Sequence, residues 1–201
     1  MTFKNCILPI LIILFLSSCS NTKYHYYFET RSIVDFTEGE WILNKSKTNY
    51  NQERIDKIAQ KQFKKILGDS LVLFSEVSQG KILPAQLSFD PSAENLLDLK
   101  RATGKDYLIN VQSNMIKNET SAFPSTPAVG SAHKTNEAGI KIKIYDLNTL
   151  SLLSEGSVTG ISSVTRTAGE KGISLTNNAQ TLSMQGLIKL IKRYKKNGKT
   201  N

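Results

Sequence analysis

The segment FDPSAENLLDLKRATGKDYLINVQSN, residues 89–114, predicts a helix that is followed at once by a buried strand. Asp90 is a suitable N-cap, Pro91 fits the first helical position, and Glu94 adds negative charge to the first turn. The buried side of this helix would be formed by three leucines, Leu96, Leu97 and Leu99. Gly104 is the expected stop, and DYLINVQS then reads as the strand. A unit of this kind packs a helix on one face of a sheet.

The chain before this unit predicts a second helix with strands on both sides of it. In NQERIDKIAQKQFKKILG, residues 51–68, the apolar positions recur at helical spacing, and Gly68 is a natural stop. Strands are expected at residues 33–36 and 41–43, around a Thr-Glu-Gly turn, and again at residues 71–77. This part of the chain therefore alternates strand, helix and strand.

The chain after the unit predicts a hairpin and a closing helix. In residues 139–163, apolar and polar residues alternate, so one face of the hairpin is expected to be buried and the other wet and basic. These residues are Ile140, Ile142 and Ile144, against Lys141, Lys143 and Tyr145. The turn lies at residues 146–149, and polar loops are expected at residues 116–138 and 164–178. The last helix runs from about residue 178 to residue 196, with an apolar stripe made of Ala179, Leu182, Gly186, Leu187, Leu190, Ile191 and Tyr194.

These elements together predict an α+β fold with a sandwich-like arrangement of layers. About three helices would pack on one mostly antiparallel mixed sheet of about five or six strands. We find no internal repeat and no coiled-coil heptads, and a chain of 201 residues suits one domain.

The N-terminus MTFKNCILPILIILFLSSCS is typical of a secretory signal peptide. Its apolar run, residues 7–16, would be about 15 Å long as a helix, against the ~30 Å needed to cross the bilayer core. Leu16-Ser17-Ser18-Cys19 resembles a bacterial lipobox. The resemblance implies that Cys19 receives a diacylglyceryl thioether and becomes the acylated first residue, held on membrane lipid by two or three acyl chains. The alternative is an ordinary secretory signal whose cysteine is incidental.

The segment after Cys19, residues 20–31, has three tyrosines around His25 and two open interpretations. It is either a tether whose aromatic rings settle at a membrane interface, or a first edge strand. The predicted organisation is a lipoprotein signal peptide at residues 1–18, a lipidated N-terminus and tether at 19–31, a single α/β domain at 32–197 and a polar tail at 198–201.

Several kinds of chemistry have no support in the sequence. The only cysteines are Cys6 and Cys19, so the processed chain would have no disulfide, no cysteine nucleophile and no cysteine-bound zinc. His25 and His133 are far apart and are expected in a tail or loop, so no metal and no cofactor is predicted. GEKG at residues 169–172 lacks the spacing of a phosphate-binding loop, and neither GxSxG nor HExxH occurs. Solvated loop residues explain the acidic cluster Asp35, Glu38 and Glu40 as well as acid–base chemistry does.

The net charge of +9 favours anionic partners, among which secretion argues against nucleic acid. The strongest basic feature is a run in the last helix and the tail, formed by Lys189, Lys192, Arg193, Lys195, Lys196 and Lys199. This run could contact anionic lipid or a cell-wall polymer, at about 1 kcal/mol per charge near an anionic membrane surface. The alternative is a solvated helix end whose cations complement the helix dipole.

The order of elements is similar to that of the small α/β domain of envelope lipoproteins. This group includes the curli-secretion lipoproteins, the penicillin-binding-protein activator lipoproteins and the TolB N-terminal domain. The matching residues are Thr103-Gly104, Asp106-Tyr107-Leu108-Ile109, Tyr145-Asp146-Leu147 and Leu153. The resemblance implies a module without enzymatic activity that binds or assembles with other envelope proteins. Pore formation is not carried over, because the polar, proline-containing residues 116–138 do not predict a membrane-spanning hairpin.

The first hypothesis is a lipid-anchored accessory protein that faces the periplasm from the outer membrane. Ser20 is compatible with sorting to the outer membrane, because aspartate at that position is the usual retention signal in enterobacterial-type cells. The second is an envelope enzyme that acts on cell-wall glycan through carboxylates assembled by the fold. The third is a homo-oligomer that pairs through an exposed strand edge. An enzyme would need convergent carboxylates with shifted pKa values in a concave site, whereas an accessory protein would need an exposed apolar or basic patch.

Overall fold

The secondary structure follows the predicted α+β class. A computed structural model describes residues 21–30, 33–84, 86–119, 132–166 and 176–199. The strands are β1 (Asn21–Thr30), β2 (Trp41–Leu43), β3 (Lys47–Thr48), β4 (Leu71–Leu73), β5 (Tyr107–Lys117), β6 (Ala132–Asp146) and β7 (Ser151–Arg166). The α-helices in these residues are α2 (Gln52–Leu67), α3 (Phe74–Val77), α4 (Ala93–Thr103) and α5 (Ala179–Asn197).

The strands form one mixed sheet of seven strands in the order β1-β7-β6-β5-β2-β4, with β3 paired to β5. The long strands β1, β7, β6 and β5 are antiparallel neighbours, and the short strands β2, β3 and β4 run parallel to their neighbours. The sheet therefore has one strand more than the upper limit of the sequence estimate. The antiparallel and parallel parts meet at β5.

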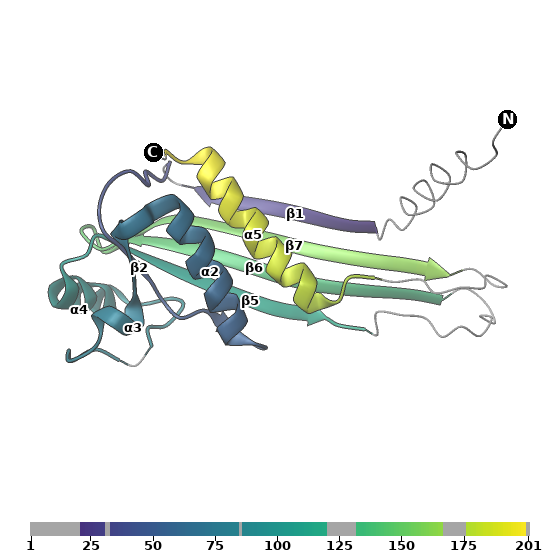
Figure 1. Ribbon diagram of the computed structural model, residues 1–201, viewed down its shortest axis with the longest axis horizontal. Coiled ribbons are helices and arrows are strands. Elements are labelled where there is room, and N and C mark those ends of the chain that lie inside the picture. Colours follow the sequence, from purple (N-terminus) through teal and green to yellow (C-terminus); the bar gives the residue numbers. More distant parts are fainter. Residues whose placement is uncertain (1–20, 31–32, 85, 120–131, 167–175, 200–201) are drawn as a thin grey trace, which may run out of the picture.

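Helices cover the two faces of the sheet unequally. α2 and α5 lie side by side across the long strands (Figure 1), and the core beneath them includes Phe63, Ile142 and Leu187. On the opposite face, a second core cluster packs α3, α4 and residues 83–87 only over the end of the sheet near β2. α5 lies especially close to the sheet, because a Cβ added at Gly186 would be 2.6 Å from Cδ1 of Ile140.

The helix ends were predicted correctly except at the start of α4. Gly68 and Gly104 end α2 and α4 with left-handed φ angles of 55° and 70°, as glycine permits. The N-cap of α4 is Ser92 and not Asp90, since the Ser92 hydroxyl accepts the backbone N–H of Asn95 while the Asn95 side chain accepts that of Ser92. Asp90 forms an ion pair with Lys143 instead.

Two predicted strands and one predicted loop are shorter than expected. Residues 33–36 form only an isolated bridge between Asp35 and Lys199, so the last turn of the chain is not a free tail. In residues 71–77 the strand stops at Leu73, where the Glu76 carboxylate accepts the Leu73 backbone N–H and starts α3. The expected loop at 116–138 is partly strand, because β5 continues to Lys117 and β6 begins at Ala132.

The segment that was left open between tether and edge strand forms the edge strand β1. Its ten residues pair antiparallel with β7, from Asn21 opposite Ser163 to Thr30 opposite Ser154. The assignment of residues 19–31 to a tether is therefore wrong for residues 21–30, because cross-strand pairing extends the sheet beyond residue 32. His25 and His133 lie exposed in β1 and β6, and not in a tail or a loop.

The predicted wet face of the β6–β7 hairpin is partly covered. Ile140, Ile142 and Ile144 are buried as expected. On the other face, however, Tyr145 is also buried, because it packs in the second core cluster and donates a hydrogen bond to the Phe89 carbonyl oxygen. Lys143 beside it is enclosed between Asp90 and Glu155.

Candidate functional site

Cys19, the predicted lipid attachment site, lies outside the described residues, as does the GEKG segment at residues 169–172. Chain length nevertheless limits where Cys19 can be. It precedes the first residue of β1, Asn21, by two positions. Because an extended chain spans at most about 3.6 Å per residue, the Cα atoms of Cys19 and Asn21 are no more than about 7 Å apart.

Two members of the predicted basic run lie on the tyrosines of β1. The Lys189 ammonium is 5.1 Å from the ring centroid of Tyr24, and the Arg193 guanidinium carbon is 3.7 Å from that of Tyr26. Both distances fit cation–π contacts. We call these four residues the β1–α5 surface. The sequence contained both halves of it, but only the tertiary structure brings them together.

The β1–α5 surface is cationic. No carboxylate in the described part of the chain forms an ion pair with Lys189 or Arg193. The Tyr24 hydroxyl donates to Oε1 of Gln185 at 2.9 Å, and burial, with the neighbouring Tyr26, raises the pKa of Tyr24 to about 12. Tyr24 is therefore neutral at physiological pH and leaves the positive charge of the surface uncompensated.

The other members of the basic run divide between solvent and the fold. Lys192, Lys195 and Lys196 are exposed on α5. Lys199 lies 3.2 Å from the Asp35 carboxylate, which joins the end of the chain to the segment before β2. The six residues therefore do not form a single contact surface.

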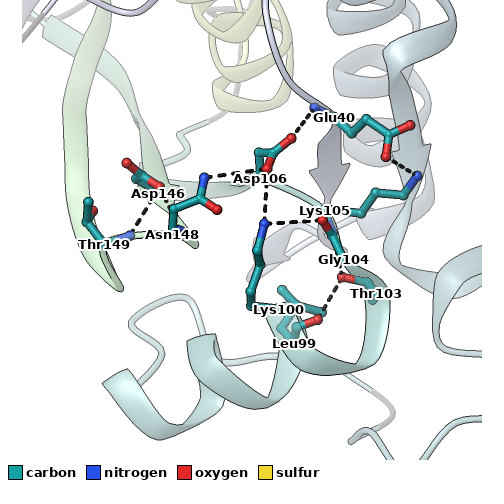
Figure 2. Close-up of polar contacts among 10 residues, drawn as sticks. All are labelled: Glu40, Leu99, Lys100, Thr103, Gly104, Lys105, Asp106, Asp146, Asn148 and Thr149. Carbon is teal, nitrogen blue, oxygen red and sulfur yellow. Dashed lines mark hydrogen bonds and ion pairs between the residues drawn. The ribbon is translucent and has the colours of Figure 1, made fainter.

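A second group of polar residues joins the start of β5 to three neighbouring segments (Figure 2). Asp106 accepts the backbone N–H of Glu40 through Oδ2, at 3.0 Å. Its Oδ1 lies 3.0 Å from the Lys100 ammonium and 3.4 Å from Nδ2 of Asn148. One carboxylate thus connects the residue before β2, the last turn of α4 and the turn between β6 and β7. We call this group the Asp106 junction.

Further contacts complete the Asp106 junction (Figure 2). Lys100 also donates to the Gly104 carbonyl oxygen at 3.2 Å, and the Lys105 ammonium pairs with Glu40 at 2.8 Å. The Asp146 carboxylate accepts the backbone N–H groups of Asn148 and Thr149, which shapes the hairpin turn.

The Asp106 junction explains the residues on which the sequence resemblance rested. Burial by itself raises the pKa of Asp106, but hydrogen bonds from Glu40, Lys100 and Asn148 outweigh it and hold the pKa below its ordinary value. Both carboxylate oxygens are already occupied by partners. The Thr-Gly-Lys-Asp-Tyr sequence therefore stabilises the fold at this point.

The predicted acidic cluster is divided by the fold. Asp35 accepts hydrogen bonds from the backbone and hydroxyl of Thr37, and Glu40 pairs with Lys105. In the described residues, no group of three or more His, Cys, Asp or Glu side chains could hold a metal ion. No helix within the same residues is both long and apolar enough to cross a membrane.

A pocket of about 470 Å³ opens where β2 ends beside β5. Its lining includes Asn44, Lys45, Lys47, Gln86, Phe89 and Asn110. Two lysines and no carboxylate are among the described residues that line it. We call it the switch pocket, because the chain connections leave β2 and enter β5 on opposite sides of the sheet.

These features define an α+β domain with two candidate contact regions, the cationic β1–α5 surface and the switch pocket. No protein-family model matches this chain, and no curated protein matches its sequence.

Solved structures with a similar order of elements come from bacteria. The PelC dodecamer from Paraburkholderia phytofirmans is similar at a TM-score of 0.47 and 11% identity, over 86% of this chain and 94% of that chain. Lipoprotein GNA1162 from Neisseria meningitidis is similar at 0.37 and 11%, over 74% and 92%. LpoB from E. coli is similar at 0.36 and 12%, over 64% and 59%. At these scores and identities, none of the three indicates what this chain binds or does.

Proposed function

We propose that this chain is a lipid-anchored protein of the bacterial envelope that binds or assembles with other envelope proteins. It faces the periplasm from the outer membrane, attached through the acylated Cys19. The observation that carries the proposal is the sequence Leu16-Ser17-Ser18-Cys19, which ends one residue short of the first strand of the domain. The acyl chains would thus hold the folded domain directly at the membrane surface.

The electrostatics of the domain favour binding over hydrolysis of cell-wall glycan. A glycosidase acid needs a raised pKa to remain protonated. The described carboxylates with shifted pKa values are Asp35, Glu53, Asp106, Glu119 and Glu155, and in each the pKa is lowered. Hydrogen bonds and ion pairs cause these shifts and outweigh burial wherever burial opposes them. These carboxylates act as partners within the fold.

The lipid anchor is tested by metabolic labelling of cells with an alkyne fatty acid. We expect the natural chain to be labelled and to sediment with the outer membrane. Cys19→Ala should lose both properties, because the thioether sulfur is gone. Cys6→Ala is the matched control, since Cys6 would leave with the signal peptide, and it should be labelled normally. An unlabelled natural chain, or label that persists in Cys19→Ala, would contradict the anchor.

The accessory role is tested by crosslinking in cells, followed by mass spectrometry of what a C-terminally tagged chain captures. We expect one abundant envelope protein that is lost when Cys19→Ala releases the chain from the membrane. Self-crosslinks alone would instead indicate a homo-oligomer. Absence of any crosslink would contradict both of these binding roles.

We also propose that the β1–α5 surface lies on anionic lipid headgroups of the membrane that holds Cys19. Tyr24 and Tyr26 follow Cys19 by five and seven residues, so they lie within about 25 Å of the anchor along an extended chain. Tyrosine rings are favoured at the headgroup level, and cations near an anionic surface contribute about 1 kcal/mol each.

This contact predicts weaker vesicle binding after charge reversal. In the mature chain with Cys19→Ala, which removes the acyl anchor, adding Lys189→Glu and Arg193→Glu should lower affinity for phosphatidylglycerol vesicles by at least tenfold in a sedimentation assay. Lys61→Glu with Lys65→Glu makes the same change in charge on exposed positions of α2 and is the control. An equal loss in both variants would show that only net charge matters.

A further inference from the structure

The switch pocket lies at the place in the sheet where a ligand site is easiest to form. β2 has parallel neighbours on both sides, β4 and β5. The chain leaves β2 through α2, returns in β4, and then crosses through α4 to β5. Because α2 and α4 pack on opposite faces, a crevice forms outside the carboxyl end of β2, which is where open sheets of this kind bind ligands.

Two buried asparagines hold one wall of the switch pocket in place. Asn44 directly follows β2, and its Nδ2 donates to the Leu87 carbonyl oxygen at 3.0 Å. Nδ2 of Asn110, on β5, donates to the carbonyl oxygens of Ser88 and Phe89 at 3.1 and 2.9 Å. These bonds fix residues 87–89 against the sheet, so this wall is formed before any ligand arrives.

The same bonds leave one acceptor without a donor. Both amide hydrogens of Asn110 are used, which fixes the orientation of the side chain and identifies its oxygen as Oδ1. The residue is 1% exposed, and this Oδ1 has no hydrogen-bond partner. Buried acceptors are nearly always paired, and an unpaired one costs stability. The pocket therefore favours a ligand that brings an N–H or O–H donor.

The charge of the switch pocket selects the rest of the ligand. Lys45 and Lys47 line it, and neither ammonium has an ion pair with a described carboxylate. Leu87 and Phe89 supply a small apolar area beside them. An anionic group near the lysines and a donor near Asn110 would satisfy both ends of the site.

We propose that the switch pocket binds a small carboxylate that carries an N–H or O–H donor close to its charge. An acidic amino sugar and an N-acylated amino acid share this chemistry, and the volume of about 470 Å³ can hold either. The inference does not depend on the lipid anchor, since it rests only on residues of the folded domain.

The test is a titration of the ¹⁵N-labelled mature chain, carrying Cys19→Ala, with three probes. N-acetylmuramic acid has the carboxylate, the donors and the sugar; N-acetyl-D-alanine has no sugar; N-acetylglucosamine has no carboxylate. We expect saturable shifts of the side-chain NH₂ signals of Asn44 and Asn110 with one or both carboxylates, and affinity at least tenfold weaker for N-acetylglucosamine. Stronger binding of the first probe identifies a sugar ligand, and equal binding identifies the acyl amino acid as sufficient.

Variants separate the site from general charge effects. Lys45→Ala with Lys47→Ala changes two exposed side chains and should weaken carboxylate binding about tenfold while the fold remains intact. Lys195→Ala with Lys196→Ala removes the same charge from α5 and should leave affinity unchanged. Asn110→Leu should abolish the shifts at Asn44, provided that its amide spectrum remains that of a folded protein. Absence of saturable shifts with both carboxylates, or equal weakening in the two lysine variants, would overturn the proposal.

Discussion

Trp41→Ala is expected to lower the free energy of unfolding by about 3–5 kcal/mol, the range for removing a large aromatic side chain from a core. Trp41 is fully buried in β2. Its ring stacks on that of Tyr107, with centroids 4.2 Å apart, and lies 5.2 Å from the ring of Phe36. Its Nε1–H donates to the Glu38 carbonyl oxygen at 3.0 Å. Alanine would therefore remove buried area, two aromatic contacts and a hydrogen bond at once.

Denaturant unfolding followed by far-UV circular dichroism measures this loss, because Trp41 is the one tryptophan and the variant has no tryptophan fluorescence. Trp41→Phe should lose less, since it keeps an aromatic ring. Ile82→Ala is the surface control, as Ile82 is fully exposed and should change stability by less than about 0.5 kcal/mol. A loss below about 1 kcal/mol in Trp41→Ala would show that the ring stack contributes little.

Asp106→Ala is expected to cost about 2–3 kcal/mol, because hydrogen bonds to charged groups contribute about 1.5–3 kcal/mol and the junction is partly open to solvent. The variant leaves the Glu40 N–H and the Lys100 ammonium without their shared acceptor. Asp98→Ala, at an exposed position of the same helix, removes the same charge and should be nearly neutral. An equal effect of both substitutions would indicate that helix charge, and not the Asp106 junction, is responsible.

The pH dependence of unfolding provides a separate test of the Asp106 junction. The pKa of Asp106 is lower in the folded protein than its ordinary value of 3.8. The carboxylate therefore contributes its full stability above pH 3.8, and this contribution disappears as the pH falls through the lowered folded-state pKa. We expect the stability difference between the natural chain and Asp106→Ala to shrink below pH 3.8. A difference that stays constant at acid pH would contradict the role of the ionised carboxylate.

Features that depend on near neighbours in the chain could be predicted from the sequence. α2, α4 and α5 follow from apolar residues at helical spacing, and the glycine stops at Gly68 and Gly104 follow from the φ angles that only glycine adopts easily. The β6–β7 hairpin follows from alternation around a polar turn. The lipobox is likewise a local signal, because a processing enzyme reads a short linear sequence.

Features that depend on distant partners could not be predicted. Whether residues 21–30 were a tether or a strand was decided by pairing with β7, more than 120 residues away, and the same pairing placed Tyr24 and Tyr26 under Lys189 and Arg193.

The sequence by itself determined the α+β class, the main helices and the motif at Cys19, since each rests on local periodicity or a short motif. Only the tertiary structure decided the edge strand, the Asp106 junction and the switch pocket. Asn44 and Asn110 look like ordinary polar residues in the sequence. They acquire a role only because β2 and β5 become parallel neighbours and the chain folds residues 87–89 over them.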